Sequence, residues 1–342
     1  MIQIDETVIR KLILHRVCID GEKSILSNSL IENDNNEENE VLKKIFLKPF
    51  LTATTTYEFK HDIDLELNPL FKLATAIYND ENFVAKSKSI CQHLKSVSKH
   101  PNIKDGDLFV IKFDDIKLNN KFYEALGIYK VENKETYVET STKGKEEVNM
   151  AFKKGIGSKR LDKACLILFT EKPFTLFVID NNSVETDYWQ NEFIKLGLRN
   201  DNVNNTNQFL TLTKTFVTNQ FPSDFEVTKA DQIDLLNRSV EYFKTHETFD
   251  KKEFEEEVFQ DSGIIKSFRN FDNSYRQENE IEITDSFDIS PQAVKKQARV
   301  FKSVLKLDKN FHIYIHGNRE MIEQGVEKDG RKYYKIYYNE EN

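Results

Sequence analysis

The chain has 342 residues, enough for two domains, and its formal net charge is −8. Hydrophobic residues make up only 39% of it, but 26 Phe and 13 Tyr supply large apolar surfaces, so we expect most of the chain to fold. The charge argues against a protein that coats DNA over its whole surface, because such proteins are usually basic. An acidic chain needs a localised basic surface to bind DNA.

Membrane, export and disulfide signals are missing from the sequence. No stretch reaches the roughly 18 to 20 uncharged apolar residues of a membrane helix, and charged residues interrupt the apolar start at 2–17. The cysteines, Cys18, Cys91 and Cys165, are odd in number and too far apart for a disulfide framework or a CxxC metal site. We therefore expect a cytoplasmic protein with free thiols.

The first predicted elements, in chain order, form a mixed N-terminal region. Residues 31–40 (IENDNNEENE) are polar throughout and predict a solvated loop. Apolar residues at helical spacing from Leu70 to Val97 predict one or two helices that end near Pro101. Alternating or continuous apolar runs predict strands at 107–113, 122–131, 135–142, 163–169 and 174–180.

The last two of these strands are the strongest strand prediction in the chain. KACLILF and FTLFVID are almost continuously apolar, which is typical of strands buried on both faces. The short TEKP link between them favours an antiparallel hairpin. We expect this hairpin to form the centre of the sheet.

From about residue 186 to 306 the apolar spacing is mainly helical. ADQIDLLNRSVEYFKTH has the clearest stripe, and Ser290 and Pro291 can begin a helix that runs to about Lys306. The segments FHIYIHG and RKYYKIYYNE return to β structure. The sequence thus predicts an α+β protein with a mixed or antiparallel central sheet, a mainly helical middle and a C-terminal helix-strand-strand element. The expected domains are 1–182 and 183–342.

Motifs for catalysis and metal binding are weak. The Gly-x-Gly of KKGIGSKR lacks the rest of a phosphate-binding loop. His312 and His316 fall on a predicted strand with Tyr314 between them, where a half-exposed aromatic face is a simpler interpretation than a metal site. FDDIK, with Asp114 and Asp115, resembles the carboxylates of a metal-dependent nuclease, although such a charge run is more often a solvated turn. We expect no cofactor and no metal.

Three segments concentrate basic residues, although a basic face of this kind is more often simply solvated. The first surrounds Gly155 and Gly157, which would let backbone approach a phosphate. The second places charges on one face of the helix that continues to Lys306. The third alternates basic and aromatic residues along a strand, which suits phosphates and stacked bases. The candidate DNA-contacting residues are Lys153, Lys154, Lys159, Arg160, Lys163, Lys295, Lys296, Arg299, Lys302, Arg331, Tyr333 and Lys335.

The order of these segments resembles a known family. A buried hairpin (ACLILFTEKPFTLFVID), a Trp-containing helix (YWQNEFIKLGL), a helical region and the closing FHIYIHGNREMIEQGVEKDGRKYYKIYYNE are together similar to the bacterial nucleoid-associated proteins of the NdpA type. The resemblance spans nearly the whole chain and implies association with the nucleoid and DNA binding. It transfers no catalytic residue.

The leading hypothesis is therefore a non-catalytic, nucleoid-associated protein that contacts DNA phosphates with little sequence specificity. Double-stranded DNA is the expected partner, and a homodimer or a protein partner would fit. One alternative is a metal-dependent nuclease. Another is an interaction component of a phage-defence or genome-maintenance system. A salt-dependent DNA titration separates the leading hypothesis from both.

Overall fold

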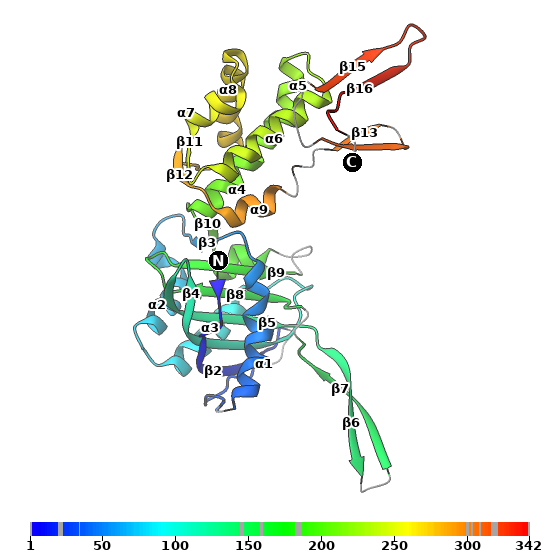
Figure 1. Ribbon diagram of the computed structural model, residues 1–342. Helices are drawn as coiled ribbons and strands as arrows, with labels where there is room; N and C mark the ends of the chain where they lie inside the picture. The colour runs from blue at the N-terminus through cyan, green and yellow to red at the C-terminus, as the bar shows by residue number, and fades with distance from the viewer. Residues whose placement is uncertain are drawn as a thin grey trace. The chain divides into compact units, whose positions relative to one another are not determined.

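The computed structural model describes residues 2–19, 23–33, 35–143, 147–157, 160–181, 187–298, 301, 304–307, 309–315 and 321–340. The chain divides into two compact units, Met1–Arg199 and Asn200–Asn342 (Figure 1). This division lies later in the chain than the expected one after residue 182, and the Trp189 side chain packs in the core of the first unit. Helices together with antiparallel strands confirm the α+β class.

The first unit is organised around an antiparallel sheet of eight strands. Its order is β1-β4-β5-β8-β9-β3-β10, and β2 pairs with β4 beside β1. The strands are β1 (Ile2–Gln3), β2 (Val8–Val17), β3 (Tyr57–Phe59), β4 (Gly106–Leu118), β5 (Lys121–Val131), β8 (Lys163–Leu168), β9 (Thr175–Asp180) and β10 (Leu196–Leu198).

The predicted hairpin of β8 and β9 is confirmed, and it lies between β5 and β3. Every residue of β8 is buried. Because side chains alternate across a strand, Cys165 and Ile167 enter one core of the unit, while Ala164 and Leu166 enter the other. Burial on both faces explains why the segment is apolar without alternation.

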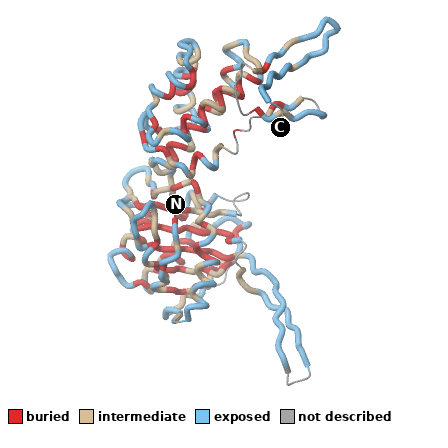
Figure 2. The backbone as a smooth tube through the Cα atoms, in the orientation of Figure 1, coloured by how far each residue is buried: buried red, intermediate tan, exposed pale blue. Residues whose placement is uncertain are grey.

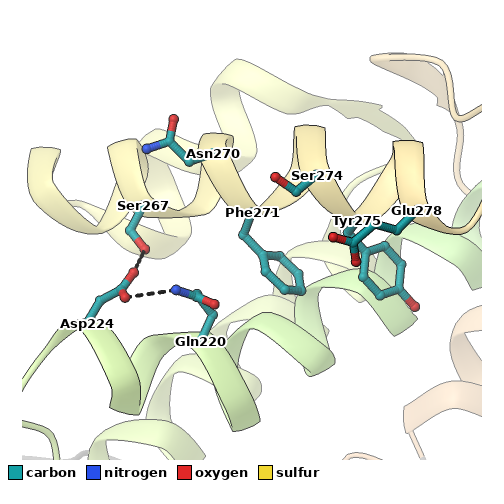
Figure 3. A pocket seen from close by; sticks show the side chains of 8 residues that line it. All are labelled: Gln220, Asp224, Ser267, Asn270, Phe271, Ser274, Tyr275 and Glu278. Atoms are coloured by element: carbon teal, nitrogen blue, oxygen red, sulfur yellow. Dashed lines mark hydrogen bonds between the residues drawn. The ribbon is translucent and has the colours of Figure 1, made fainter.

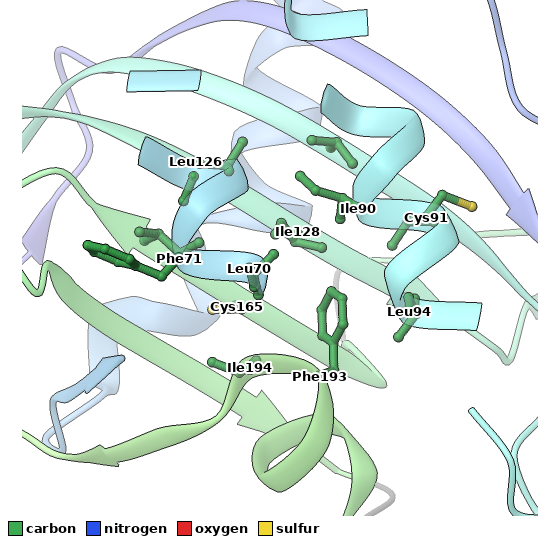
Figure 4. Packing of buried hydrophobic residues seen from close by; sticks show 14 of the residues in the cluster. Leu70, Phe71, Ile90, Cys91, Leu94, Leu126, Ile128, Cys165, Phe193 and Ile194 are labelled. Carbon is green, nitrogen blue, oxygen red and sulfur yellow. The ribbon is translucent and has the colours of Figure 1, made fainter. Parts of the chain in front are cut away.

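Helices cover both faces of this sheet (Figure 1). The helices α2 and α3 pack over the face that carries Leu126, Ile128 and Cys165 (Figure 4), and the π-helical turn η3 contributes Trp189 and Phe193 to the same core. The opposite core contains Phe46 of α1 and Phe50 of the short helix η1. The bounds are α1 (Asn36–Phe46), η1 (Lys48–Thr52), η2 (Leu65–Leu67), α2 (Pro69–Tyr78), α3 (Phe83–Val97) and η3 (Trp189–Ile194).

The polar tract at 31–40 is only partly the loop that its composition predicted. Asn35 caps a helix by accepting a hydrogen bond from the Glu37 backbone, so α1 begins inside the tract. Glu37 and Glu38 then lie in the first turn, where negative charge is favoured by the helix dipole. The loop prediction was wrong there because polar residues also cap helices and favour their first turn, so a polar composition alone does not distinguish a loop from a helix start.

A second hairpin, β6 (Glu135–Lys143) with β7 (Glu147–Gly155), forms its own two-stranded sheet and extends from the main sheet (Figure 1). We call it the arm. The residues of β7 from Glu147 to Lys154 are all exposed, as are the described ones of β6 (Figure 2). The sequence predicted β6 but not β7.

The second unit is mainly helical, as expected, and its core is rich in phenylalanine. Phe209, Phe216, Phe249, Phe254 and Phe268 are all fully buried. The elements are α4 (Asn202–Thr215), η4 (Phe216–Gln220), α5 (Phe221–Asp224), α6 (Lys229–Thr245), β11 (Thr248–Asp250), α7 (Lys251–Phe254), η5 (Glu255–Phe259), α8 (Ser262–Glu278), β12 (Ser286–Asp288) and α9 (Pro291–Ala298).

The C-terminal part follows α9 with two hairpins. The first pairs β13 (Val304–Leu307) with β14 (Phe311–Tyr314), and the second pairs β15 (Ile322–Val326) with β16 (Lys332–Ile336). The prediction of helix as far as residue 306 was therefore wrong at 304–306. Leu305 packs with Ile315 and Ile322 beside α6, so a contact with strands beyond it overrides its helical spacing.

Candidate nucleic-acid interface

The first basic segment lies at the arm and its root, in the first unit. Lys153 on β7 is exposed and forms an ion pair across the arm with Glu139 at 2.5 Å, which raises the pKa of its ammonium. Lys154 is exposed on the other face of the ribbon. Arg160 donates from Nη2 to the Asn181 carbonyl at 2.6 Å. Lys159 lies outside the described residues.

Lys163 is not a surface residue. Its side chain is 2% exposed, and its Nζ lies 2.6 Å from Asp180 Oδ1 and 5.0 Å from the centre of the Tyr188 ring. A buried ammonium needs such partners because desolvation would otherwise oppose its charge. Lys163 therefore stabilises the β8–β9 hairpin and cannot reach a phosphate, which removes it from the candidate interface.

The second basic segment is carried by α9, whose sequence start is confirmed with Pro291 as its first residue. Lys295 and Lys296 are exposed, whereas Ala293 and Val294 are buried at 0% and 4%. Lys306 is also exposed, but it lies on β13 rather than on a continuation of the helix, so the expected single helical face is wrong at this residue.

Two further candidates of this segment, Arg299 and Lys302, lie outside the described residues. Phe301 and Leu305, which flank Lys302 in the sequence, are buried at 6% and 4% exposure. The segment is thus attached to the second unit at several apolar positions. Its described lysines point away from those positions into solvent.

The third basic segment is the C-terminal hairpin. Arg331 Nε lies 2.7 Å from Asp329 Oδ2, and Lys335 Nζ lies 3.7 Å from Glu323 Oε2 on the neighbouring strand. Tyr337 first and Glu323 second raise the pKa of Lys335. Tyr333 is 40% exposed and covers Gly325, where a Cβ would lie only 2.3 Å from its hydroxyl oxygen. The charges of this segment are therefore largely compensated locally.

A family model described as nucleoid-associated protein YejK matches residues 13–331. The chain belongs to this family. The resemblance that the sequence suggested is therefore confirmed, and so is the nucleoid-associated role. A search of curated proteins finds no match to the chain.

Within this nucleoid-associated protein, Asp114 and Asp115 do not occupy a turn after a strand. They lie in a bulge inside β4, and Asp115 has a positive φ of 59°. Burial and then the charge of Glu124 raise the pKa of Asp114, and Arg10 Nε lies 3.8 Å from its carboxylate. Among the described residues, the group with suitable metal-ligand spacing is His246, Glu253 and Glu257, which does not include either aspartate.

The cysteines of the chain are free, as the sequence predicted, and all three are buried. Burial raises the pKa of the Cys91 thiol to about 11 and raises that of Cys165 further. Thiols of this kind remain protonated near neutral pH and are poor nucleophiles. No described helix is both long and apolar enough to cross a membrane.

Two features escaped the sequence analysis. The first is a groove of about 330 Å³ in the second unit, between α8 and the segment of η4 and α5 (Figure 3). Asp224 at its edge accepts hydrogen bonds from Gln220 and Ser267, and Glu278 adds a second carboxylate. Its acidic lining excludes it from a phosphate-binding surface. The second is the apolar face of the arm, where Val148, Met150 and Phe152 alternate along β7 and the register places Val138 opposite Phe152.

Proposed function

We propose that this nucleoid-associated protein binds double-stranded DNA through the phosphates, without catalysis and with little sequence specificity. The observation that carries the proposal is the charge of residues 289–307. This stretch contains Lys295, Lys296, Arg299, Lys302 and Lys306 and no acidic residue, in a chain with a net charge of −8. A basic stretch this distinct from its surroundings can attract phosphates even though the chain as a whole repels them.

Anchoring of the stretch supports this function. Val294 and Phe301 enter the phenylalanine-rich core, and Leu305 enters the smaller C-terminal core, while Lys295 and Lys306 remain exposed. Fixed backbone reduces the conformational entropy that is lost when lysines contact a ligand. Lys295 and Lys306 are thus presented on an ordered surface rather than on a loose tail.

Neutral hydrogen-bonding groups surround α9. Gln297 donates from Nε2 to Asn207 Oδ1 of α4 at 3.4 Å, and both of these amides are partly exposed. Thr206, which accepts from the Ser290 backbone at 3.0 Å, is buried and only holds the start of the helix. Amide and hydroxyl side chains contact phosphate and sugar as readily as they contact one another. Their position next to the lysines favours a backbone-binding surface.

Low sequence specificity follows from the same geometry. The helix α9 is only 8 residues long, and Ala293 and Val294 are used for packing. Specific readers place several side chains of one helix on base edges in the major groove. The charged residues of α9 are lysines, which pair with phosphates. Phosphates are the same at every base pair, so such contacts do not distinguish one DNA sequence from another. Location with the nucleoid in the cytoplasm is part of this proposal.

The test is a fluorescence-anisotropy titration of labelled duplex at several salt concentrations, with wild type and Lys295→Glu/Lys296→Glu. Loss of two phosphate contacts should weaken binding at low salt and reduce the slope of log K against log salt by about 2. The matched control is Lys244→Glu/Lys252→Glu. Its two lysines are exposed in the same unit, but each lies beside a glutamate, at 3.6 and 4.0 Å.

Both variants change the net charge equally, so a general electrostatic effect would weaken them alike. The proposal requires a clear loss in the α9 variant and near wild-type binding in the control. Equal loss in both variants would reject a localised surface. A wild-type protein that does not bind duplex at low salt would reject direct DNA binding altogether.

A further inference from the structure

Three side chains with metal-ligand chemistry meet at one point of the second unit. His246 caps the end of α6, and Glu253 and Glu257 follow it on α7 and η5. One ligand atom of each, an imidazole nitrogen and two carboxylate oxygens, all lie within 4.8 Å of one another. Among the described residues, no other group of three histidine, cysteine or acidic side chains has this spacing.

Core contacts position the two glutamates. The backbone passes from α7 directly into η5, and Phe254 and Val258 of this segment are buried in the phenylalanine-rich core. Glu253 and Glu257 each precede one of these anchors by one position. Because the two glutamates are four residues apart, they lie on one helical face, and both are exposed. The packing of the segment therefore fixes the backbone that carries the two carboxylates.

The contacts of His246 determine which of its nitrogens can bind an ion. Nδ1 lies 3.0 Å from the Tyr242 carbonyl oxygen, which can only accept, so the proton of the neutral imidazole is on Nδ1. Nε2 then carries a lone pair, and it lies 3.6 Å from Glu257 Oε2. Two acceptors thus face each other across a gap that is too long for a hydrogen bond. A cation between them would convert this repulsion into two favourable contacts.

Tyr242 orients two of the three groups from outside the cluster. Its side chain is 3% exposed, and its ring stacks on the His246 imidazole with centroids 4.1 Å apart and planes 15° from parallel. Its hydroxyl donates to Glu253 Oε2 at 3.0 Å. Metal ligands in proteins are commonly held by such outer contacts, a carbonyl on the second histidine nitrogen and a donor on the carboxylate. The buried tyrosine therefore holds the histidine and one glutamate in positions suited to a shared ion.

Neither glutamate of the cluster forms an ion pair with a lysine or arginine of the described chain. The ion pairs next to them use other carboxylates, since Lys252 lies 4.0 Å from Glu256 and Arg269 lies 2.7 Å from Glu255. Two carboxylates beside a neutral imidazole are balanced by a divalent cation, which would be the largest local charge at this place. The charge of the cluster therefore favours a metal ion as its ligand.

We propose that His246 Nε2 and the carboxylates of Glu253 and Glu257 bind one Zn²⁺ ion. Zn²⁺ accepts a ligand set of nitrogen and carboxylate oxygen, whereas Mg²⁺ and Ca²⁺ prefer oxygen alone. In a tetrahedral site with bonds of about 2.0–2.1 Å, ligand atoms are roughly 3.3 Å apart. The distance of 3.6 Å between Nε2 and Glu257 Oε2 is close to this value, and rotation of the exposed Glu253 side chain brings the third ligand nearer. The fourth position is open to water.

A bound ion would link the end of α6 to the segment of α7 and η5, and so stabilise the second unit. The unfolded chain does not hold the three ligands together, and an ion that binds only the folded chain raises its stability by mass action. The site lies outside the basic stretch 289–307, so metal binding and DNA binding can be tested separately.

The experiment is isothermal titration calorimetry of the metal-free full chain with ZnCl₂ near neutral pH. Wild type should bind Zn²⁺ at this site. Tyr242→Phe keeps the ring but removes the hydroxyl from Glu253, and should raise the dissociation constant by about tenfold. His246→Ala and Glu257→Gln each remove a direct ligand and should raise it by more than about 100-fold, because direct ligands contribute more than outer contacts.

Two matched controls change the same residue types outside the cluster. Glu256→Gln removes the carboxylate next to Glu257 in the sequence, and His100→Ala removes an exposed histidine of the first unit. Neither should change the affinity for Zn²⁺. Circular dichroism without metal checks that each variant folds.

Thermal unfolding of the same proteins gives a second measurement. Zn²⁺ should raise the Tm of wild type and of both controls, and EDTA should reverse the increase. His246→Ala and Glu257→Gln should show no increase, because they no longer bind the ion at the concentrations used.

A wild-type chain that binds no Zn²⁺ overturns the inference, and His246 and Glu257 then form an ion pair only when the imidazole is protonated. Zn²⁺ binding that survives both His246→Ala and Glu257→Gln also overturns it, because the ion is then held elsewhere. So does an equal loss in the control variants. Failure of the DNA titration leaves these outcomes unaffected, since none of them involves nucleic acid.

Discussion

Two hairpins that follow one another along the first unit, the arm and β8–β9, use similar residues in opposite ways. Each contains strand-forming apolar residues and a lysine paired with a carboxylate. In β8–β9 the pair of Lys163 and Asp180 is buried, at 2% and 1% side-chain exposure, whereas Lys153 and Glu139 are 50% and 47% exposed. The same chemical pair is structural in one hairpin and solvated in the other.

A charge pattern in the sequence therefore does not identify a binding residue until the burial of each side chain is known. Lys153 and Lys163 belong to one basic segment in the sequence, yet only Lys153 can meet a ligand. The apolar residues show the same contrast, since Ile167 is inaccessible and Phe152 is 69% exposed.

The largest effect is expected for Lys163→Ala. It leaves the Asp180 carboxylate buried without its ammonium partner, which should reduce the free energy of unfolding by about 3–5 kcal/mol. Chemical denaturation measures this change. Lys153→Ala removes the exposed partner of Glu139 and should have no measurable effect on stability. Similar losses in the two variants would contradict the contrast between the hairpins.

The buried histidine of the same sheet should make stability depend on pH. His15 Nδ1 accepts from the Ser27 backbone at 3.1 Å, Nε2 lies 3.0 Å from Ser87 Oγ, and burial followed by the charge of Lys88 lowers its pKa to about 4. In the unfolded chain His15 takes up a proton near pH 6.5, whereas in the folded chain it does so only near pH 4. The free energy of unfolding therefore has its full value above pH 6.5 and falls as the pH drops towards 4.

The expected loss over this window is about 3 kcal/mol. Thermal or urea unfolding across the range measures it, and His15→Gln should remove most of the slope between pH 6.5 and 5. Carboxylates titrate mainly below that range, which separates their contribution. A variant with the slope of wild type would show that His15 is not the group responsible.

A smaller effect is expected at the root of the arm. Asp162→Ala leaves two backbone N–H groups without their acceptor, and the free energy of unfolding should fall by about 2 kcal/mol. Asp162→Asn keeps one acceptor oxygen and should recover part of the loss. Amide hydrogen exchange should increase at residues 132 and 133, where the hydrogen bonds end. Unchanged exchange there would mean that Asp162 does not order the root.

The smallest effect is expected for Phe152→Ala on the arm. Its ring is exposed, so at low micromolar protein concentration the free energy of unfolding should change by less than about 0.5 kcal/mol. Ile167→Ala in the buried hairpin should cost about 2–5 kcal/mol in the same assay. A large loss at Phe152 would show that the arm packs within its own chain.

Much of the fold could be predicted where local pattern and burial agree. The β8–β9 hairpin is apolar because both of its faces are covered, and Thr228 with Asp231 forms a capping box where the helical stripe of α6 begins. The segment 304–307 could not be predicted in this way. The spacing of Phe301 and Leu305 suits a helix, and the partners that make it a strand come later in the chain.

The candidate site was predictable in composition but not in geometry. The basic character of Lys295 and Lys296 is evident from the sequence, and their exposure confirms that they are accessible. The sequence does contain a signal for the burial of Lys163, because this residue begins a strand that is apolar on both faces. The apolar face of the arm also has a signal, since Val148, Met150 and Phe152 alternate with Asn149 and Ala151 along β7.

The central claim, phosphate contact through 289–307, is tested most directly by lysine acetylation of the protein with and without duplex DNA, read by mass spectrometry. Duplex should protect Lys295, Lys296 and Lys306, while Lys244 and Lys252 should be modified equally in both samples. Protection that is absent from α9, or that is equal at all exposed lysines, would contradict the claim.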